Sequence, residues 1–275
     1  MMLIRLLFCG DIVARAGREC IEKHLPHLRK HYKLDCVIAN VDNAAHGIGV
    51  TVEIVDQLHT AGVDVCTGGN HVWDKKEGRQ ALERCPWLIR PYNHPIALPG
   101  NGVCIYPLPN GGKIVILQLL GSLYTKIPVE NPFTAADRVL KDYILGKNIS
   151  AIFVDFHAEA TSEKMALAYY LDGRVSALIG THTHIPTADT FILPKGTAYQ
   201  TDAGMCGDYN SVIGMVPKTA IDCFLYPYHT DSLMPTEDEA TLCGTLIDID
   251  PSSGRPHTIL PIRIGGILPQ SLPTL

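Results

Sequence analysis

The sequence has no long hydrophobic run, no signal-peptide pattern and no excess of positive charge. Its best apolar run, Ile114–Leu123, is about half the length of a membrane-spanning helix. Met1–Phe8 is apolar, but Gly10 and Asp11 follow at once, which does not match a secretory leader. The net charge is −5, whereas a dedicated nucleic-acid-binding protein is usually basic. We therefore expect a cytoplasmic protein that does not enter the membrane and does not bind nucleic acid directly.

Nine cysteines are spread along the chain, and no two of them form a CxxC pair. The odd count and the scatter do not resemble a disulfide framework. Cys9, Cys36 and Cys66 stand at the ends of apolar runs, where a free cysteine packs as a small hydrophobic residue. We expect reduced thiols, and we assign no thiolate metal site or cysteine nucleophile.

The first half of the chain alternates short apolar runs with stretches of helical periodicity. With 275 residues, of which 46% are hydrophobic, the chain can bury a core without disulfide or metal support. No linker or low-complexity tract divides it, so we treat residues 1–275 as a single domain. The alternation predicts a parallel sheet covered by helices. Strands are expected at residues 3–9, 36–39 and 63–66, and helices at residues 15–31 and 51–60.

The second half repeats this pattern and then changes. Strands are expected at residues 113–119, 151–156 and 175–179, and helices at residues 134–145 and 162–171. After Ile185 the apolar runs become shorter and are interrupted by Pro and Gly, which favours antiparallel strands at residues 190–193, 197–201, 240–249 and 258–264. The fold class predicted from these patterns is α/β with two packed sheets.

Side chains that can bind a metal follow five of the expected strands. Taken singly, an Asp at such a place is more often a helix cap or turn residue, and a His is more often an ordinary packed or surface residue. In an open α/β sheet, however, ligands bind at the carboxyl ends of the strands. The positions are Asp11, Asp42, Asn43, Asn70, His71, His157, His182 and His184.

These residue types together indicate a transition-metal site. Asp, Asn and His suit iron, manganese or zinc, whereas calcium prefers an all-oxygen shell. Two ions about 3.5–4 Å apart would need about this many ligands and one bridging carboxylate. Gly69 and Gly180 stand beside the candidate ligands, where a strand end that turns sharply favours a residue without Cβ.

The same segments form an ordered motif series: Gly10–Asp11, Asp42–Asn43–Ala44–Ala45, Gly69–Asn70–His71, His157–Ala158–Glu159 and Gly180–Thr181–His182–Thr183–His184. This series resembles that of the calcineurin-like metallophosphoesterases, and more narrowly their bacterial YmdB-like branch, over about residues 3–265. The resemblance implies a four-layer α/β/β/α sandwich, in which two mixed sheets are flanked by helices. It also implies two divalent or mixed-valence metal ions per chain, with iron or manganese favoured over zinc or magnesium.

The resemblance assigns a role to each candidate residue. One ion would be held by Asp11, Asn43 and His184, the other by Asn70, His157 and His182, and Asp42 would bridge the two. His71 would bind no metal and would point at the substrate phosphoryl group. Two positions depart from related patterns: Val13 stands where the wider superfamily has a His, and Asp42 stands where the branch usually has a Glu.

The activity implied is that of a dinuclear metal-dependent phosphodiesterase. A metal-bridging hydroxide would attack phosphorus, and His71 would protonate the leaving oxygen as a general acid. The expected substrates are small phosphoesters, namely 2′,3′- or 3′,5′-cyclic nucleotides. Two alternatives stay open: a regulatory or interaction protein with a structural or low-activity metal centre, and a general phosphomonoesterase. The branch also suggests self-association into a homo-oligomer.

The sequence assigns no substrate contact. Five aromatic residues could stack on a base, although packing is the favoured interpretation for each of them. Lys126 is interpreted as an ordinary surface charge and Asp202 as a turn residue. The five aromatic residues are Trp73, Tyr92, Tyr124, Tyr199 and Tyr209.

Overall fold

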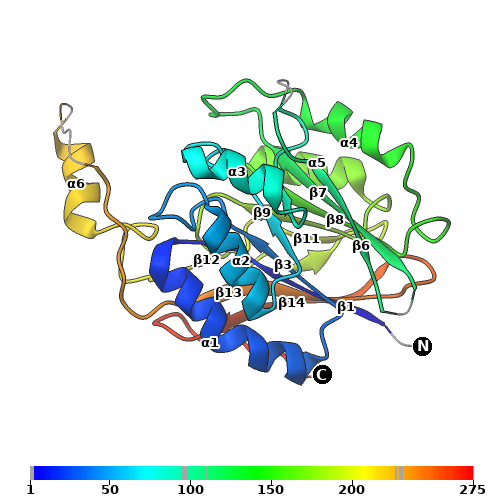
Figure 1. Ribbon diagram of the computed structural model, residues 1–275. Helices are drawn as coiled ribbons and strands as arrows, with labels where there is room; N and C mark the ends of the chain where they lie inside the picture. Colours follow the sequence, from blue (N-terminus) through cyan, green and yellow to red (C-terminus); the bar gives the residue numbers. More distant parts are fainter. Residues whose placement is uncertain (1–2, 95–97, 110, 227, 229–231, 275) are drawn as a thin grey trace.

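Two six-stranded sheets form the centre of the protein in a computed structural model, which describes residues 3–94, 98–109, 111–226, 228 and 232–274 (Figure 1). The first sheet has the strand order β14-β13-β1-β3-β4-β5, and the second has the order β10-β11-β9-β8-β7-β6. The first contains β1 (Ile4–Cys9), β3 (Cys36–Asn40), β4 (Val65–Thr67), β5 (Leu88–Ile89), β13 (Leu242–Ile249) and β14 (Pro256–Ile264). The second contains β6 (Val103–Pro107), β7 (Lys113–Leu120), β8 (Ala151–His157), β9 (Ala177–Thr181), β10 (Phe191–Ile192) and β11 (Ala198–Gln200). A short pair, β2 (Asp11–Ile12) and β12 (Met205–Cys206), lies apart from both.

Helices cover the outer faces of the two sheets (Figure 1). The helices are α1 (Ala14–Tyr32), α2 (Val52–Ala61), α3 (Lys76–Arg84), α4 (Pro132–Leu140), α5 (Thr161–Leu171) and α6 (Pro217–Leu225). The first three pack on the first sheet, whereas α4 and α5 pack on the second. Thr51 begins α2 by accepting a hydrogen bond from the Ile54 amide at 3.3 Å, as an N-cap residue does.

The alternation of side chains in β1 separates the layers. Ile4, Leu6 and Phe8 point into the core between the two sheets, whereas Leu7 and Cys9 point toward the helices. This is the period of two expected of a strand with both faces buried. The four-layer α/β/β/α arrangement is therefore confirmed.

The final third differs in part from expectation. β13 and β14 pair antiparallel as predicted, and so do β10 and β11. On its other side β11 pairs parallel with β9, because the chain crosses over before adding this strand. Helix α4 ends at Leu140, five residues before its expected end. The chain also forms α3 and α6, for which no helix was predicted.

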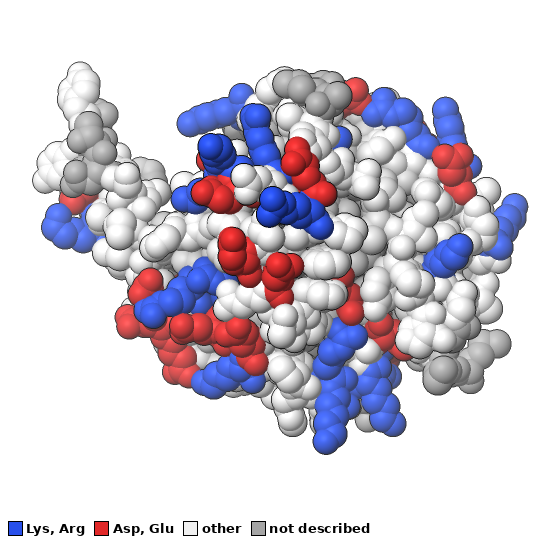
Figure 2. Space-filling model, viewed as in Figure 1, with Lys and Arg blue, Asp and Glu red and all other residues white. Residues whose placement is uncertain are grey.

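Helix α6 stands away from the body of the protein (Figure 1) and presents mostly uncharged surface (Figure 2). Ile221, Phe224 and Leu225 are exposed on it, and Ala220 is its one buried residue. Elsewhere on the same face, Lys and Arg are mixed with Asp and Glu (Figure 2).

Within the described ranges, no helix is long and apolar enough to cross a membrane. All nine cysteines are free thiols, as expected. Self-association stays a prediction.

The contact between the sheets can be tested at Phe153. Its ring centroid lies 5.0 Å from that of Phe8, and both side chains are fully buried. Phe153→Ala is expected to lower the free energy of unfolding by about 3–5 kcal/mol, because it leaves a cavity between the sheets. Phe224→Ala, on the exposed face of α6, is the matched control and should change it by less than about 0.5 kcal/mol. Equal urea midpoints for the two variants would contradict the packing described.

Candidate metal centre

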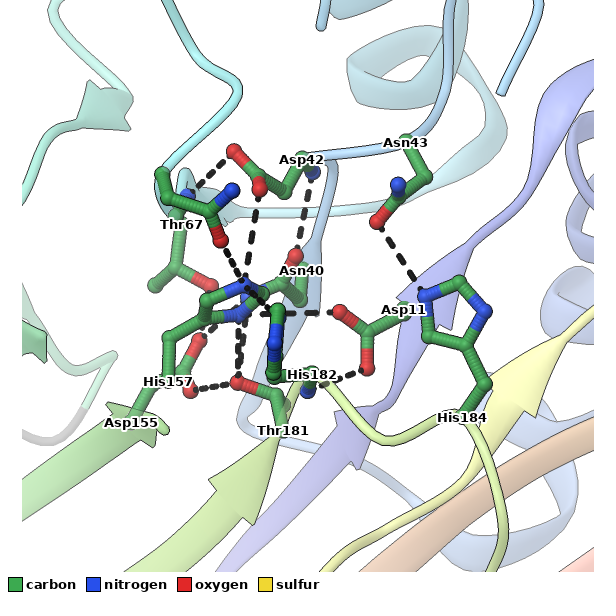
Figure 3. Close-up of polar contacts among 12 residues, drawn as sticks. Asp11, Asn40, Asp42, Asn43, Thr67, Asp155, His157, Thr181, His182 and His184 are labelled. Atoms are coloured by element: carbon green, nitrogen blue, oxygen red, sulfur yellow. Dashed lines mark hydrogen bonds and ion pairs between the residues drawn. The ribbon is translucent and has the colours of Figure 1, made fainter. Parts of the chain in front are cut away.

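The predicted ligands converge at the carboxyl ends of strands from both sheets (Figure 3). Contacts link five of them into one group around His157, and the other two form a neighbouring pair. The first group is Asp11, Asp42, Asn70, His157 and His182, and the pair is Asn43 and His184. This convergence follows from the parallel register of β1, β3 and β4 and of β8 and β9, which places their carboxyl ends at one edge.

His157 lies at the centre of the first group. Its Nε2 atom is 3.0 Å from Asn70 Oδ1 and 3.1 Å from His182 Nδ1. Asp42 Oδ2 lies 3.4 Å from the same nitrogen. The side chain is almost entirely buried, and this burial lowers the pKa of His157 well below its usual value, so the ring is neutral near pH 7.

Hydrogen bonds fix which nitrogen of each ring carries the proton. Thr181 Oγ1 donates to Asp155 at 2.7 Å, so it accepts from Nδ1 of His157 at 3.0 Å and leaves Nε2 unprotonated. Glu159 Oε2 lies 3.2 Å from His182 Nε2 and can only accept, so Nδ1 of His182 is unprotonated as well. Burial also lowers the pKa of His182. Two bare nitrogens therefore face each other.

The pair formed by Asn43 and His184 has the same character. Asn43 donates from Nδ2 to the Gly47 carbonyl at 2.9 Å, which turns its Oδ1 toward His184. His184 donates from Nδ1 to the Ile213 carbonyl at 2.8 Å, and burial lowers the pKa of this ring. Its bare Nε2 consequently lies 3.3 Å from Asn43 Oδ1, with no proton between the two lone pairs.

Two buried carboxylates complete the donor set. Asp11 accepts from the His182 amide at 3.0 Å through Oδ2, while its Oδ1 is buried without a hydrogen bond. Burial raises the pKa of Asp11 well above its usual value. Asp42 accepts from the amides of Gly69 and His71 at 2.6 and 3.0 Å, and burial raises its pKa to about 6. A Cβ atom on Gly69 would lie 2.5 Å from His157 Nε2, so only glycine fits there.

The arrangement of these lone pairs fits bound cations. Ligands about 2.1 Å from a shared ion lie about 3.0–3.4 Å apart for angles between about 90° and 110°. The donor pairs around His157 and at His184 have these separations and no protons to join them. Among the described residues, no three His, Cys, Asp or Glu side chains form a ready-made site, and the amides of Asn43 and Asn70 would supply part of each shell. The metal centre stays a prediction.

Asp155 holds together the strand ends that carry the donor set, a role that the sequence analysis missed. It is fully buried at the inner edge of the site and accepts hydrogen bonds from Asn40, Thr67 and Thr181 at 2.9, 2.5 and 2.7 Å. It thus ties the ends of β3, β4 and β9 to its own strand β8. Burial raises the pKa of Asp155 to about 6, although the three hydrogen bonds oppose this rise. A carboxylate within an otherwise apolar strand was the available signal.

A buried ion pair holds the loop that carries two of the histidines. Lys164 Nζ donates to Asp202 and to the Thr181 carbonyl, both at 2.8 Å, and neither charged side chain is exposed. Asp202 also accepts from the amide and hydroxyl of Thr183 at 3.0 and 2.7 Å. The histidines on either side of Thr183 have φ of 99° and 65°, a backbone strain that such surrounding contacts must maintain. Asp202 therefore does more than form the turn expected from the sequence.

His71 lies beside the donor set but does not join it. Its Nδ1 atom is 2.7 Å from Asp74 Oδ2, and about a third of the side chain is exposed. The ring lines a cavity of about 410 Å³ together with Asn70, His157 and His182. Its action on a substrate rather than on a metal stays a prediction. Asp74, which orients the ring, was not identified from the sequence.

The sequence model of YmdB-like proteins matches residues 7–262. The chain belongs to the YmdB-like protein family. A relative from Bacillus subtilis (strain 168), named 2′,3′-cyclic-nucleotide 2′-phosphodiesterase, is 44% identical over 247 residues, which cover 90% of this chain and 92% of the relative. Two crystal structures each have a TM-score of 0.89 and cover 96% of this chain. A hypothetical protein from Thermus thermophilus is 40% identical and covered completely, and a novel phosphatase from Mycoplasma pneumoniae is 34% identical and 95% covered.

In this YmdB-like protein, Lys164→Met tests the buried ion pair. The variant leaves Asp202 buried without a counter-charge, which is expected to lower the free energy of unfolding by about 3–5 kcal/mol. Lys23→Met removes an exposed lysine that lies 3.6 Å from Glu239, and it should cost less than about 1 kcal/mol. Urea unfolding of both variants measures the difference. If Lys164→Met unfolded at the wild-type midpoint, the ion pair would not hold the loop.

Proposed function

We propose that this protein is a phosphodiesterase that hydrolyses cyclic nucleotides, with 2′,3′-cyclic nucleotides as the first candidates. Its family and its Bacillus subtilis relative support hydrolysis of phosphoric esters as the reaction class. One structural observation carries the proposal. Unprotonated nitrogens and carboxylates meet at one edge of the sheets, and they border an open cavity that also contains the His71 ring.

We propose that two metal ions occupy this edge. When bound, they would supply Lewis-acid chemistry: activation of water and neutralisation of phosphoryl charge. The three imidazole nitrogens among the seven donors suit iron or manganese better than magnesium, which prefers an all-oxygen shell. One ion would be held by Asp11, Asn43 and His184, and the other by Asn70, His157 and His182, with Asp42 shared.

His71 supplies the proton in this proposal. The Asp74 carboxylate accepts from Nδ1 and fixes the ring, so that the other ring nitrogen can face the cavity. A ribose oxygen leaves as a strongly basic alkoxide unless it is protonated as the bond breaks. His71 therefore acts as the general acid, and its backbone amide also holds Asp42. A cytoplasmic location and self-association are further parts of the proposal.

His71→Ala tests the general acid. Hydrolysis of a 2′,3′-cyclic nucleotide is expected to fall by about 10²–10⁴-fold, while a diester with a p-nitrophenolate leaving group should be less affected, because that group needs no proton. Metal content, measured by elemental analysis, should not change. His27→Ala, on the exposed side of α1, controls for loss of an imidazole. Parent-level turnover of the cyclic nucleotide by His71→Ala would exclude the assignment.

Metal binding should depend on pH through Asp42. Its raised pKa of about 6 means that protons compete with metal ions well above the pH at which an ordinary carboxylate titrates. We expect about two Mn²⁺ ions per chain at pH 7, and an affinity that falls as the pH drops toward 5. His157 has a lowered pKa and therefore competes only at lower pH.

Calorimetric Mn²⁺ titrations between pH 5 and 7 measure this dependence. Asp42→Asn should lose affinity at all pH values and show a smaller pH dependence near 6, because Asp11, whose pKa burial also raises, still binds protons in this variant. Asp238→Asn, at an exposed position, should match the wild type. A wild-type affinity that is constant over this pH range would contradict the role of Asp42.

A further inference from the structure

One wall of the cavity is formed by the segment that follows β7. Residues 120, 121 and 123–127 line the cavity on this side, and Asn70, His157 and His182 line it on the side of the donor set. The same cavity contains His71. A phosphoester seated at the donor set would therefore extend against this segment.

Both ends of the segment are anchored by one buried asparagine. Asn93 is fully buried; its side chain donates to the carbonyls of Leu120 and Glu130 at 2.8 and 2.9 Å and accepts from the Leu120 amide at 2.9 Å. The Glu130 amide donates to the Asn93 carbonyl at 2.7 Å. The two ends of the segment are thereby held together.

Glu163, in the first turn of α5, holds the segment a second time. Its carboxylate accepts from the amide and hydroxyl of Ser122, both at 2.7 Å, and from the Leu123 amide at 3.3 Å. This carboxylate is buried, so its charge is stabilised by these hydrogen bonds. A connection that only joined a strand to a helix would not need two buried polar anchors. The anchoring indicates a segment with a fixed conformation.

The fixed segment presents an aromatic ring at the cavity. Tyr124 is 83% exposed, and its φ of 60° is unusual for a residue with a side chain. Of the other aromatic candidates, Tyr199 is buried and the Tyr209 hydroxyl lies 3.0 Å from the His184 carbonyl, so neither is available to a ligand. Trp73 is only partly buried, but it packs against the His94 ring and the core behind the first sheet.

The segment also carries the one Lys or Arg that lines the cavity among the described residues. Lys126 is exposed and forms no ion pair or hydrogen bond with any described residue. The acidic residues of the cavity, Asp74 and Glu159, are already bound to His71 and His182. The Lys126 ammonium is therefore free to meet an anionic ligand.

We propose that residues 123–127 form the nucleotide-recognition edge of the site, where Tyr124 stacks on the base and Lys126 binds a phosphoryl oxygen. The ligand class is a nucleoside carrying a phosphate on its ribose, and this inference rests on the proposed function. Base–aromatic stacking tolerates any base because every base has a π-face. The edge thus selects nucleotides over small phosphoesters without selecting one base.

Equilibrium binding of adenosine 3′-monophosphate and of inorganic phosphate, measured by calorimetry on the protein as purified, tests this edge. The nucleotide is the product of opening a 2′,3′-cyclic nucleotide at the 2′ oxygen, so it reports binding without hydrolysis of a phosphodiester. Tyr124→Ala should weaken nucleotide binding by about 5- to 150-fold, and Tyr124→Phe should restore it because the ring is kept. Lys126→Met should weaken binding of both ligands by about 5-fold or more.

Two exposed residues of the same types serve as controls: Tyr169→Ala on α5 and Lys141→Met after α4 should bind like the wild type. Wild-type nucleotide affinity in Tyr124→Ala, or an effect of Lys126→Met no larger than that of Lys141→Met, would overturn the inference. Failure of the wild type to bind the nucleotide would overturn it as well. Hydrolysis of phosphodiesters by the wild type is measured in parallel, and its absence would instead refute the proposed function.

Discussion

An excess of buried negative charge at the ends of the central strands is the constraint on which the site depends. Asp11, Asp42, Asp155 and Asp202 are all fully buried. Lys164 is the one buried Lys or Arg among the described residues, and it neutralises only Asp202 directly. A buried charge without a counter-charge or sufficient hydrogen bonds is strongly unfavourable. Bound cations between Asp11 and Asp42 would supply the missing positive charge, and the proposed metal centre would then have a structural as well as a chemical role.

The supporting groups and the predicted metal ligands have different roles. Asp155 ties the strand ends together through hydroxyls and an amide, and the pair of Lys164 and Asp202 maintains the strained histidine loop. These groups leave the bare nitrogens of His157 and His182 directed at each other, and that of His184 directed at the Asn43 oxygen, rather than at hydrogen-bond donors. These histidine nitrogens are therefore not occupied by hydrogen-bond donors, which is a condition for binding a metal ion. On the cavity side, His71 and the anchored segment beyond β7 face the place where a substrate would sit.

Local sequence patterns predicted the fold and identified the polar residues that meet at the strand ends, because both depend on short-range features. An apolar run followed by Asp42 and Asn43 identifies a strand and the polar end of that strand at once. The supporting groups were missed because they act at long range: Lys164 and Asp202 are 38 residues apart, and no periodicity joins them. Lys126 is an exposed charge, as expected, and only tertiary structure brings its segment to the cavity. Pairing of β11 with β9 likewise depends on a crossover that Pro and Gly spacing does not encode.

We propose above all that Asp42 is shared by two cations at this edge. The most direct measurement is anomalous diffraction from a crystal grown with Mn²⁺, with data collected on both sides of the manganese absorption edge. We expect two anomalous peaks about 3.5–4 Å apart, with Asp42 bonded to both and His157 and His184 bonded to different ions. A map with no peak at Asp42, despite saturating Mn²⁺ at pH 7, would contradict it.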